Sequence, residues 1–282
     1  MRSDLRFVGG LHAGDAVHAG QVGELLQEFR GARGIPQEHT VGKVRALHAG
    51  PEMLVGDVHA QAVALQQLAH LDQFRRTLAA KKPVFIDKPL AGSLKDAVEI
   101  VRLAREHNIP IFSSSSLRYP PETFASKFAK IGDITSVYSI GPAEFEPHHP
   151  DFFWYGIHCV EALYTVLGPG CVSVQRTHSA NTDVITGVWS DGRVGTMRGN
   201  RNTKGAYGLT VFGSNAVVSP ELKVNYSPLL KEVVKFFQTR VAPVTPEETV
   251  EIMAFMEAAD ESKRRGGAPV SIADVMKANQ PR

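Results

Sequence analysis

The stretch Pro83-Val-Phe-Ile-Asp-Lys-Pro89, followed by Ser93–His107 and Ile109–Phe112, decides the fold class of the first half of the chain. Its apolar start suits a short strand that is buried on both faces of a parallel sheet. Ser93 is a suitable N-cap, and the apolar residues that follow it recur at helical spacing. A second short apolar run begins at Ile109. Strand, helix and strand in this order predict a βαβ unit with parallel strands.

The pattern changes after Pro120-Pro121. Helices are predicted over 121–131 and over Phe153–Leu167, where Gly168-Pro169-Gly170 gives a firm stop. Asp191-Gly192 is a strong hairpin turn. The predicted strands are Ile134–Phe145, Val172–Thr177, Asp183–Ser190, Val194–Arg198, Leu209–Phe212 and Val217–Val218, and the predicted late helices are Pro228–Gln238 and Pro246–Arg264.

These elements predict an α/β part followed by an α+β part with a mostly antiparallel open sheet. We expect the two domains to be residues 1–120 and 121–282. Residues 1–67 are harder to interpret, although Ala16–Phe29 and Asp57–Leu78 favour helices. Residues 1–73 hold only the aromatics Phe7 and Phe29, yet six of the eleven histidines.

Composition excludes several classes of protein. The 282 residues are 43% hydrophobic and 21% charged, which excludes full-length disorder, collagen and coiled coil. The net charge of +2 gives no reason to expect nucleic acid or an anionic membrane as partner. No apolar run approaches the roughly 20 residues of a membrane span, and the start shows no secretory signal, so we expect a cytoplasmic protein.

The two cysteines, Cys159 and Cys171, cannot form a disulfide framework or a CxxC zinc site. We expect both to be buried free thiols. A metal site could be suggested by His148, His149, Asp151 and His158, but their spacing fits no zinc rule, so no metal is expected.

Lys88 and His158 are the strongest candidates for chemistry. Lys88 follows an apolar strand, and ligands of open α/β sheets bind at the carboxyl ends of strands. The alternative is a lysine that points to solvent at a strand end. His158 lies early in an apolar helix, three residues before Glu161 on the same helix face. Its imidazole suits acid–base work near neutral pH, and the alternative is a packed, hydrogen-bonded histidine.

Several ordered segments of residues 68–282 resemble the Gfo/Idh/MocA oxidoreductases, the group of glucose–fructose oxidoreductase and inositol dehydrogenase. Thr77–Ala91 is similar to the Glu-Lys-Pro segment of the family, with Asp87 in place of Glu. Ser116-Leu-Arg-Tyr-Pro-Pro121 resembles its Asn-x-Arg-Phe-x-Pro segment, and Gly156-Ile-His158 resembles its Asp-x-Gly-x-His helix. The ending from Pro243 to Val270 also resembles the last helix and strand of the family.

The resemblance implies a Rossmann domain, an α/β domain whose open sheet mediates homo-oligomers, and NAD or NADP as cofactor. It implies a sugar or polyol substrate and hydride transfer, with catalytic roles for Lys88 and His158. The implied cofactor-binding residues are His70, Asp87, Lys88 and Pro89, and the implied substrate-binding residues are Arg118, Tyr119, Trp154 and His158.

Two departures from the family pattern stand out. The aspartate of the family that precedes the histidine by four residues falls on Trp154, which could stack on a sugar ring or simply pack. The dinucleotide fingerprint G-x-G-x-x-G is also missing, because the glycines of the nearest candidate stand at 9, 10 and 14. One hypothesis is that residues 1–67 come from a shifted reading frame or a misplaced start, and the other is a divergent native N-terminus.

These departures leave three functions open. The first is an NAD(P)-dependent oxidoreductase, impaired if the missing fingerprint prevents cofactor binding. The second is a cofactor-free member that binds sugars or assembles with other subunits. The third is a lyase or glycoside-cleaving member that uses nicotinamide transiently.

Overall fold

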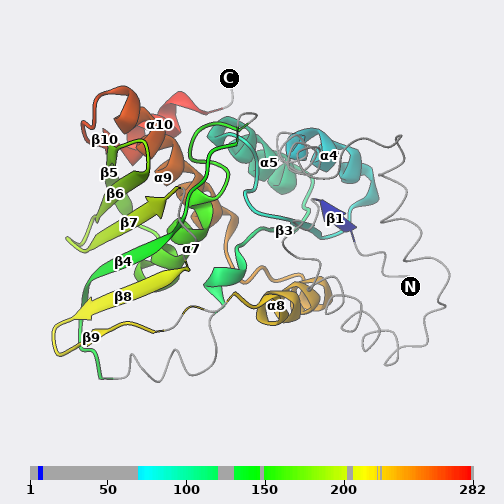
Figure 1. The fold of residues 1–282 in the computed structure, drawn as a ribbon. Helices are drawn as coiled ribbons and strands as arrows, with labels where there is room; N and C mark the ends of the chain where they lie inside the picture. Colours follow the sequence, from blue (N-terminus) through cyan, green and yellow to red (C-terminus); the bar gives the residue numbers. More distant parts are fainter. Residues whose placement is uncertain are drawn as a thin grey trace, which may run out of the picture. The chain divides into compact units, whose positions relative to one another are not determined.

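The computed structural model describes residues 69–119, 130–146, 149–201, 206–220, 222 and 224–280, together with the backbone of residues 6–8. All of them belong to one compact unit. The predicted helices at Ala16–Phe29 and 121–131, and the part of Asp57–Leu78 before residue 69, lie outside the described residues. Within the described residues the chain forms a small sheet and a larger one, both flanked by helices (Figure 1).

The small sheet is parallel, with strand order β1-β2-β3. Its strands are β1 (Arg6–Val8), β2 (Val84–Ile86) and β3 (Ile111–Phe112). β2 and β3 are joined by α5 (Leu94–Glu106), which confirms the predicted βαβ unit. The helix starts where the N-cap predicts, because the Ser93 side chain accepts a hydrogen bond from the Asp96 N–H at 3.1 Å.

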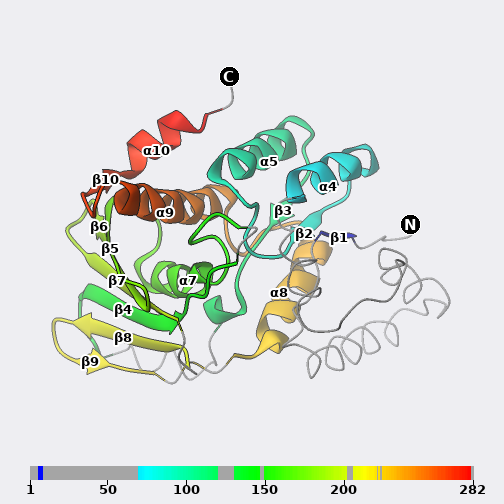
Figure 2. The same ribbon diagram turned by 45° about the horizontal axis from the view of Figure 1, so that its top comes forward.

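Helices cover both faces of this small sheet (Figure 2). On one face, Val84 and Ile86 join the core formed with α5 and with α4 (His70–Thr77). On the other face, Phe85 and Phe112 pack against α8 (Tyr226–Thr239). The sequence predicts this late helix but not its position, so residues beyond 121 complete the core of the N-terminal part.

The larger sheet has the order β10-β5-β6-β7-β4-β8-β9. Neighbouring strands are antiparallel except for the parallel pair β4 and β7. The hairpin between β6 and β7 turns at Asp191-Gly192 as predicted, and Gly192 has a φ of +88°, which favours glycine. The strands are β4 (Ile134–Pro142), β5 (Cys171–His178), β6 (Thr182–Trp189), β7 (Val194–Asn200), β8 (Gly208–Gly213), β9 (Val217–Val218) and β10 (Val270–Ser271).

One face of the larger sheet is packed against helices. α7 (Gly156–Leu167) lies on β4 and β7, and α9 (Pro246–Arg264) lies on β5. α9 also contacts α5, so it joins the two sheets. A short helix, α10 (Ile272–Ala278), follows β10 and was not predicted. The opposite face of the sheet carries no helix among the described residues (Figures 1 and 2).

Two predicted boundaries are wrong. α7 begins at Gly156 rather than at Phe153, because the aromatic residues before it form a turn that starts with the Phe153 N–H donating to the Pro150 carbonyl at 2.9 Å. β4 ends at Pro142 rather than at Phe145. Pro142 is still paired with Asn200, and the Ala143 N–H donates to the Asn200 carbonyl at 2.9 Å, but β7 ends at Asn200 and offers no partner beyond it.

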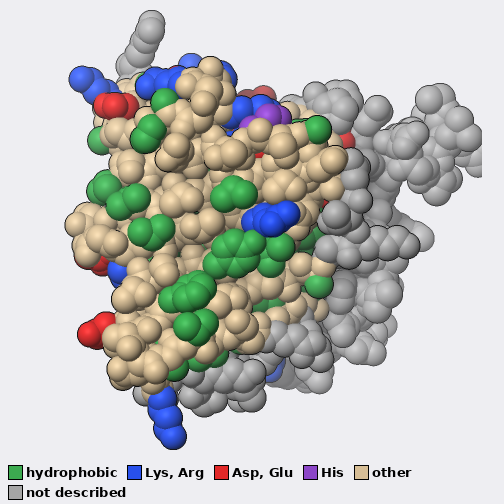
Figure 3. All heavy atoms as spheres, turned by 60° about the vertical axis from the view of Figure 1, so that its left-hand side comes forward, with side chains coloured by type: hydrophobic (Ala, Val, Ile, Leu, Met, Phe, Trp, Pro, Cys, Tyr) green, Lys and Arg blue, Asp and Glu red, His purple; other side chains and the backbone are tan. Residues whose placement is uncertain are grey.

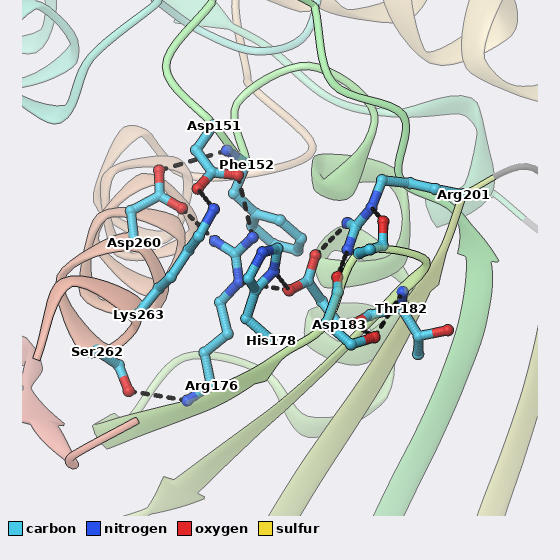
Figure 4. A network of polar contacts seen from close by, with 12 residues as sticks. Asp151, Phe152, Arg176, His178, Thr182, Asp183, Arg201, Asp260, Ser262 and Lys263 are labelled. Atoms are coloured by element: carbon cyan, nitrogen blue, oxygen red, sulfur yellow. Dashed lines mark hydrogen bonds and ion pairs between the residues drawn. The ribbon is translucent and has the colours of Figure 1, made fainter. Parts of the chain in front are cut away.

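A buried network of ionic groups lies where β5, β6 and α9 meet (Figure 4). Arg176 is fully buried and donates to Asp183 at 2.9 Å, to Asp260 at 2.5 Å and to Asp151 at 3.0 Å. Arg201 binds the second oxygen of Asp183. Burial would raise the pKa of Asp183, but hydrogen bonds from Arg176 and Arg201 outweigh it and lower this pKa. For Asp260, burial dominates and raises the pKa to about 7.

Cys159 and Cys171 are buried free thiols, as predicted, and burial raises the pKa of each to about 12. Among the described helices, none is long and apolar enough to cross a membrane.

Candidate active site

Lys88 lies at the carboxyl end of β2 and does not point to solvent. Only 3% of the residue is exposed, and the Lys88–Pro89 peptide bond is cis. The Lys88 Nζ lies 5.6 Å from the centre of the Tyr155 ring. An ammonium group at this distance from an aromatic ring is held by a cation–π contact.

His158 lies in the first turn of α7 and is also buried. Its ring centre is 5.6 Å from that of Tyr155 and 5.6 Å from that of Tyr207. Its Nδ1 lies 2.8 Å from the Ser115 Oγ. Lys88 and His158 thus contact the same Tyr155 ring, although one follows β2 and the other lies on α7, in the two halves of the sequence.

The structure gives a reason for the glycine at position 156 of the Gly-Ile-His motif. A Cβ at this position would lie 2.6 Å from the Phe152 ring, which is fully buried. A larger residue would therefore push the first turn of α7 away from the ring and displace His158 with it.

Arg118 connects three elements. It ends the short 3₁₀ turn η4 (Ser116–Arg118) and donates to Glu161 of α7 at 2.6 Å and to Glu248 of α9 at 2.6 Å. Burial alone would lower the pKa of Arg118, but the two carboxylates outweigh it and raise this pKa. Glu161 is buried, and burial raises its pKa against the opposing effect of Arg118. The guanidinium therefore holds η4 against α7 and α9, and its role in substrate binding stays a prediction.

His70 is fully buried beside the same cis bond. Its Nδ1 lies 3.2 Å from the Pro89 carbonyl and 3.3 Å from the Leu90 carbonyl. A carbonyl oxygen only accepts, so Nδ1 carries the proton and Nε2 is an acceptor. Nε2 is buried without a hydrogen-bond partner among the described residues. Burial lowers the pKa of His70 to about 4, so the ring is neutral near pH 7.

The other predicted site residues surround this group. Trp154 is 7% exposed, and its ring centre lies 5.0 Å from that of His149 and 5.7 Å from that of Tyr155. Tyr119 is half-buried and packs beside α8, and burial raises the pKa of its hydroxyl. Asp87 is partly exposed. The roles assigned to these residues stay predictions.

Sequence reasoning missed Ser115, Tyr155 and Tyr207. Ser115 belongs to the serine run Ser113–Ser116 after β3. It directly precedes the segment that begins at Ser116 and resembles the family, and this position is the one sequence feature that could have pointed to it. Tyr155 lies within the Trp-Tyr-Gly-Ile-His wording, but its contact with Lys88 depends on the tertiary fold. Tyr207 precedes β8 and carries no local signal.

Among the described residues, no group of three or more His, Cys, Asp or Glu side chains could hold a metal ion. His149 is described, and His148 lies outside the described residues.

Lys88 follows a strand of a parallel sheet, and the carboxyl ends of such strands are where ligands of open α/β sheets bind. Residues 32–114 match the family model Gfo/Idh/MocA, described as an oxidoreductase family with an NAD-binding Rossmann fold. The recognition of this family in the sequence is thereby confirmed. The match begins inside residues 1–67, the segment that lacks the usual fingerprint.

Solved structures share the fold. The myo-inositol 2-dehydrogenase from Lactobacillus plantarum matches with a TM-score of 0.62 and 19% identity, over 73% of this chain and 78% of that one. An oxidoreductase from Agrobacterium radiobacter in complex with NAD+, L-tartaric acid and magnesium gives 0.60 and 15%, over 74% and 78%. GenD2 from gentamicin A biosynthesis, in complex with NAD, gives 0.62 and 19%, over 95% and 88%. A search of curated proteins finds no match.

Proposed function

We propose that this protein is an NAD(P)-dependent oxidoreductase that transfers a hydride to or from a hydroxyl-bearing carbon of a sugar or polyol. One observation carries the proposal: Lys88, which follows β2, and His158, which lies 70 residues later on α7, both contact the Tyr155 ring. The family match and the inositol dehydrogenase fold support the same class of reaction.

The nicotinamide end of the predicted cofactor site fits the residues present. The His70 Nε2 is a buried acceptor without a donor among the described residues. The other ring nitrogen of His70, Nδ1, contacts the Pro89 carbonyl next to the cis peptide bond. A carboxamide N–H of a nicotinamide is a donor of the kind that such an atom lacks. β1 ends directly before Gly9-Gly10 and runs parallel to β2, so a strand precedes the candidate glycines as in the family pattern.

In the proposed reaction, Lys88 and His158 would have different roles. A bound NAD or NADP would supply the hydride acceptor in the oxidation. Lys88 places its Nζ 5.6 Å from the centre of the Tyr155 ring, where it can polarise a substrate hydroxyl. His158 can accept the hydroxyl proton, or return it in the reverse direction, because an imidazole exchanges protons near neutral pH. The cofactor-free and the non-redox functions remain outcomes of the experiments below.

We expect NADH or NADPH to raise the unfolding temperature of the chain, since a ligand that binds only the folded state stabilises it by mass action. His70→Asn keeps a donor for the Pro89 and Leu90 carbonyls but removes the Nε2 acceptor. It should weaken binding by about two- to tenfold, the equivalent of one hydrogen bond. Thermal shift and nicotinamide fluorescence measure both effects.

The control for this titration is His107→Asn, which changes an exposed histidine at the end of α5 and should leave binding unchanged. No response of the unchanged chain at millimolar cofactor would contradict the proposal and favour the cofactor-free member. Tight binding, weakened by Gly9→Val or Gly10→Val, would contradict a shifted frame for residues 1–67.

The uncovered face of the larger sheet suits a second copy of the chain. Paired strand residues point to the same face, which places Val188 beside Val194 and Val184 beside Arg198. Phe212 lies on the same face through its pairing with Ser136. Hydrophobic side chains are spread over this part of the surface with few charged ones between them (Figure 3). Such an apolar face is typical of a homo-oligomer interface.

We therefore expect a homo-oligomer that a charge on this face dissociates. The double variant Val184→Asp with Val188→Asp should shift the chain to a smaller species, because burying unpaired carboxylates opposes association. Light scattering coupled to size-exclusion chromatography measures the mass. Val241→Asp is the control, since Val241 is 69% exposed and lies outside the sheet. A monomeric unchanged chain would refute this interface.

A further inference from the structure

We infer that Ser115 is a positioning residue for His158: its hydroxyl donates to Nδ1 and thereby holds the ring proton on Nε2. The two atoms lie 2.8 Å apart. The inference rests on the proposed function for its catalytic meaning, but the protonation of the ring is a property of the protein alone.

The other hydrogen-bond partner of the Ser115 hydroxyl indicates that this hydroxyl donates to His158. Its oxygen accepts from the Leu117 N–H at 3.1 Å, as the N-cap of η4. A hydroxyl has one proton to donate, and Ser115 is fully buried. Among the described residues, His158 Nδ1 is the partner that can accept this proton. A donation in the opposite direction would leave the buried hydroxyl proton unsatisfied, which is costly.

If Nδ1 accepts from Ser115, the neutral imidazole carries its proton on Nε2. Nε2–H can then donate a hydrogen bond to a substrate oxygen. In the reduction the ring takes up a second proton at Nδ1, and the resulting imidazolium gives its Nε2 proton to the substrate oxygen, which leaves a neutral ring whose Nδ1–H donates to the Ser115 oxygen. In the oxidation these steps run in reverse: the ring with its proton on Nδ1 accepts the hydroxyl proton at Nε2 and then loses the Nδ1 proton, so Ser115 favours the form that is ready to hydrogen-bond the carbonyl oxygen of the reduction.

The backbone at Ser115 is held by the same helix that carries His158. Glu161, one turn further along α7, accepts from the Ser115 N–H at 3.2 Å with one oxygen and from Arg118 with the other. α7 therefore binds this segment at two points, one through the side chain of Ser115 and one through its backbone. These contacts keep the hydroxyl in line with Nδ1.

Trp154 stands four residues before His158, at the position where the resembling family has an aspartate. An indole has a donor but no acceptor oxygen, so Trp154 does not offer His158 a carboxylate. The polar side chain that contacts the His158 ring is Ser115, from the segment after β3.

The test is the tautomer of His158 in the cofactor-free protein, read from two-bond ¹⁵N–¹H correlations of the imidazole and assigned with His158→Gln. We expect the Nε2–H pattern, which Ser115→Ala should convert to a mixture or to the Nδ1–H pattern. Ser115→Thr should restore it, and Ser114→Ala, which changes a neighbouring buried serine, should leave it unchanged. An Nδ1–H pattern in the unchanged protein, or no effect of Ser115→Ala, overturns the inference.

Kinetics separate this inference from the proposed function. With an active substrate, Ser115→Ala should lower kcat about three- to tenfold, as expected for one hydrogen bond, with KM nearly unchanged. The Nε2–H pattern without turnover on any sugar or polyol would contradict the proposed function and leave the position of the proton established. Turnover by a protein whose His158 carries its proton on Nδ1 would support the proposed function and contradict the inference about Ser115. If Ser115→Ala fails to fold, the spectrum of the unchanged protein still decides.

Discussion

Replacing His158 by alanine is expected to lower kcat by about a hundred- to ten-thousand-fold, the usual contribution of a general acid–base group. Lys88→Ala should cause a loss of similar size, because it removes the positive charge beside Tyr155. The absorbance of reduced nicotinamide, followed with a panel of sugars and polyols, measures turnover. Cofactor binding, measured separately, should persist in His158→Ala, because the proposed contact to nicotinamide comes from His70.

Two matched variants serve as controls for this experiment. Lys95→Ala and His107→Ala change an exposed lysine and an exposed histidine of the α5 region and should leave turnover unchanged. Full activity of His158→Ala would show that the proton passes elsewhere. Cofactor that cycles on the protein without net release of NADH would favour the lyase or glycoside-cleaving function.

Asp183→Asn is expected to destabilise the fold by about 3–5 kcal/mol, the usual cost of removing one partner from a buried ion pair. Its carboxylate is fully buried and binds both Arg176 and Arg201, so the variant leaves two buried cations without their shared partner. Urea unfolding, followed by tryptophan fluorescence, measures the free energy of unfolding. Asp191→Asn is the control: it changes a pair with Arg193 on the β6–β7 hairpin in which the Asp191 carboxylate is exposed to solvent, so water screens the charges and the free energy of unfolding should hardly change.

The pH dependence of this difference has a defined sign. The pKa of Asp183 is lowered in the folded state, so its contribution to stability is fully present above about pH 4, the ordinary pKa of an aspartate. It is lost as the pH falls through the folded pKa. The gap between the unchanged protein and Asp183→Asn should therefore narrow at low pH. An equal gap at every pH would show that packing rather than charge explains the effect.

Much of the fold follows from local signals. The Ser93 N-cap, the glycine stop after Leu167 and the turn at Asp191-Gly192 are all found where the sequence places them. Each depends on a few adjacent residues, so a single sequence is enough to read them. The shift of the α7 start has a non-local cause, since aromatic side chains of the preceding turn are buried against residues from other elements.

The candidate site was predicted only in part. Lys88 and His158 were identified from a strand end, a helix face and a family resemblance, and the structure brings both to Tyr155. Arg118 was predicted beside the substrate, but its guanidinium forms ion pairs with Glu161 and Glu248. These acids lie far apart in sequence, so their convergence on one arginine could not be inferred from spacing.

The sequence by itself determined the βαβ unit, the positions of the later strands along the chain and the turn at Asp191-Gly192, because periodicity, caps and turns act over short distances. The tertiary structure decided that α8 completes the core of the small sheet, that Arg176 is enclosed by three aspartates, and that Ser115 meets His158. Those contacts join segments that are far apart in sequence and meet only when the apolar faces of helices and sheets pack together. Packing then decides which acceptor lies close enough for a buried hydroxyl to donate to.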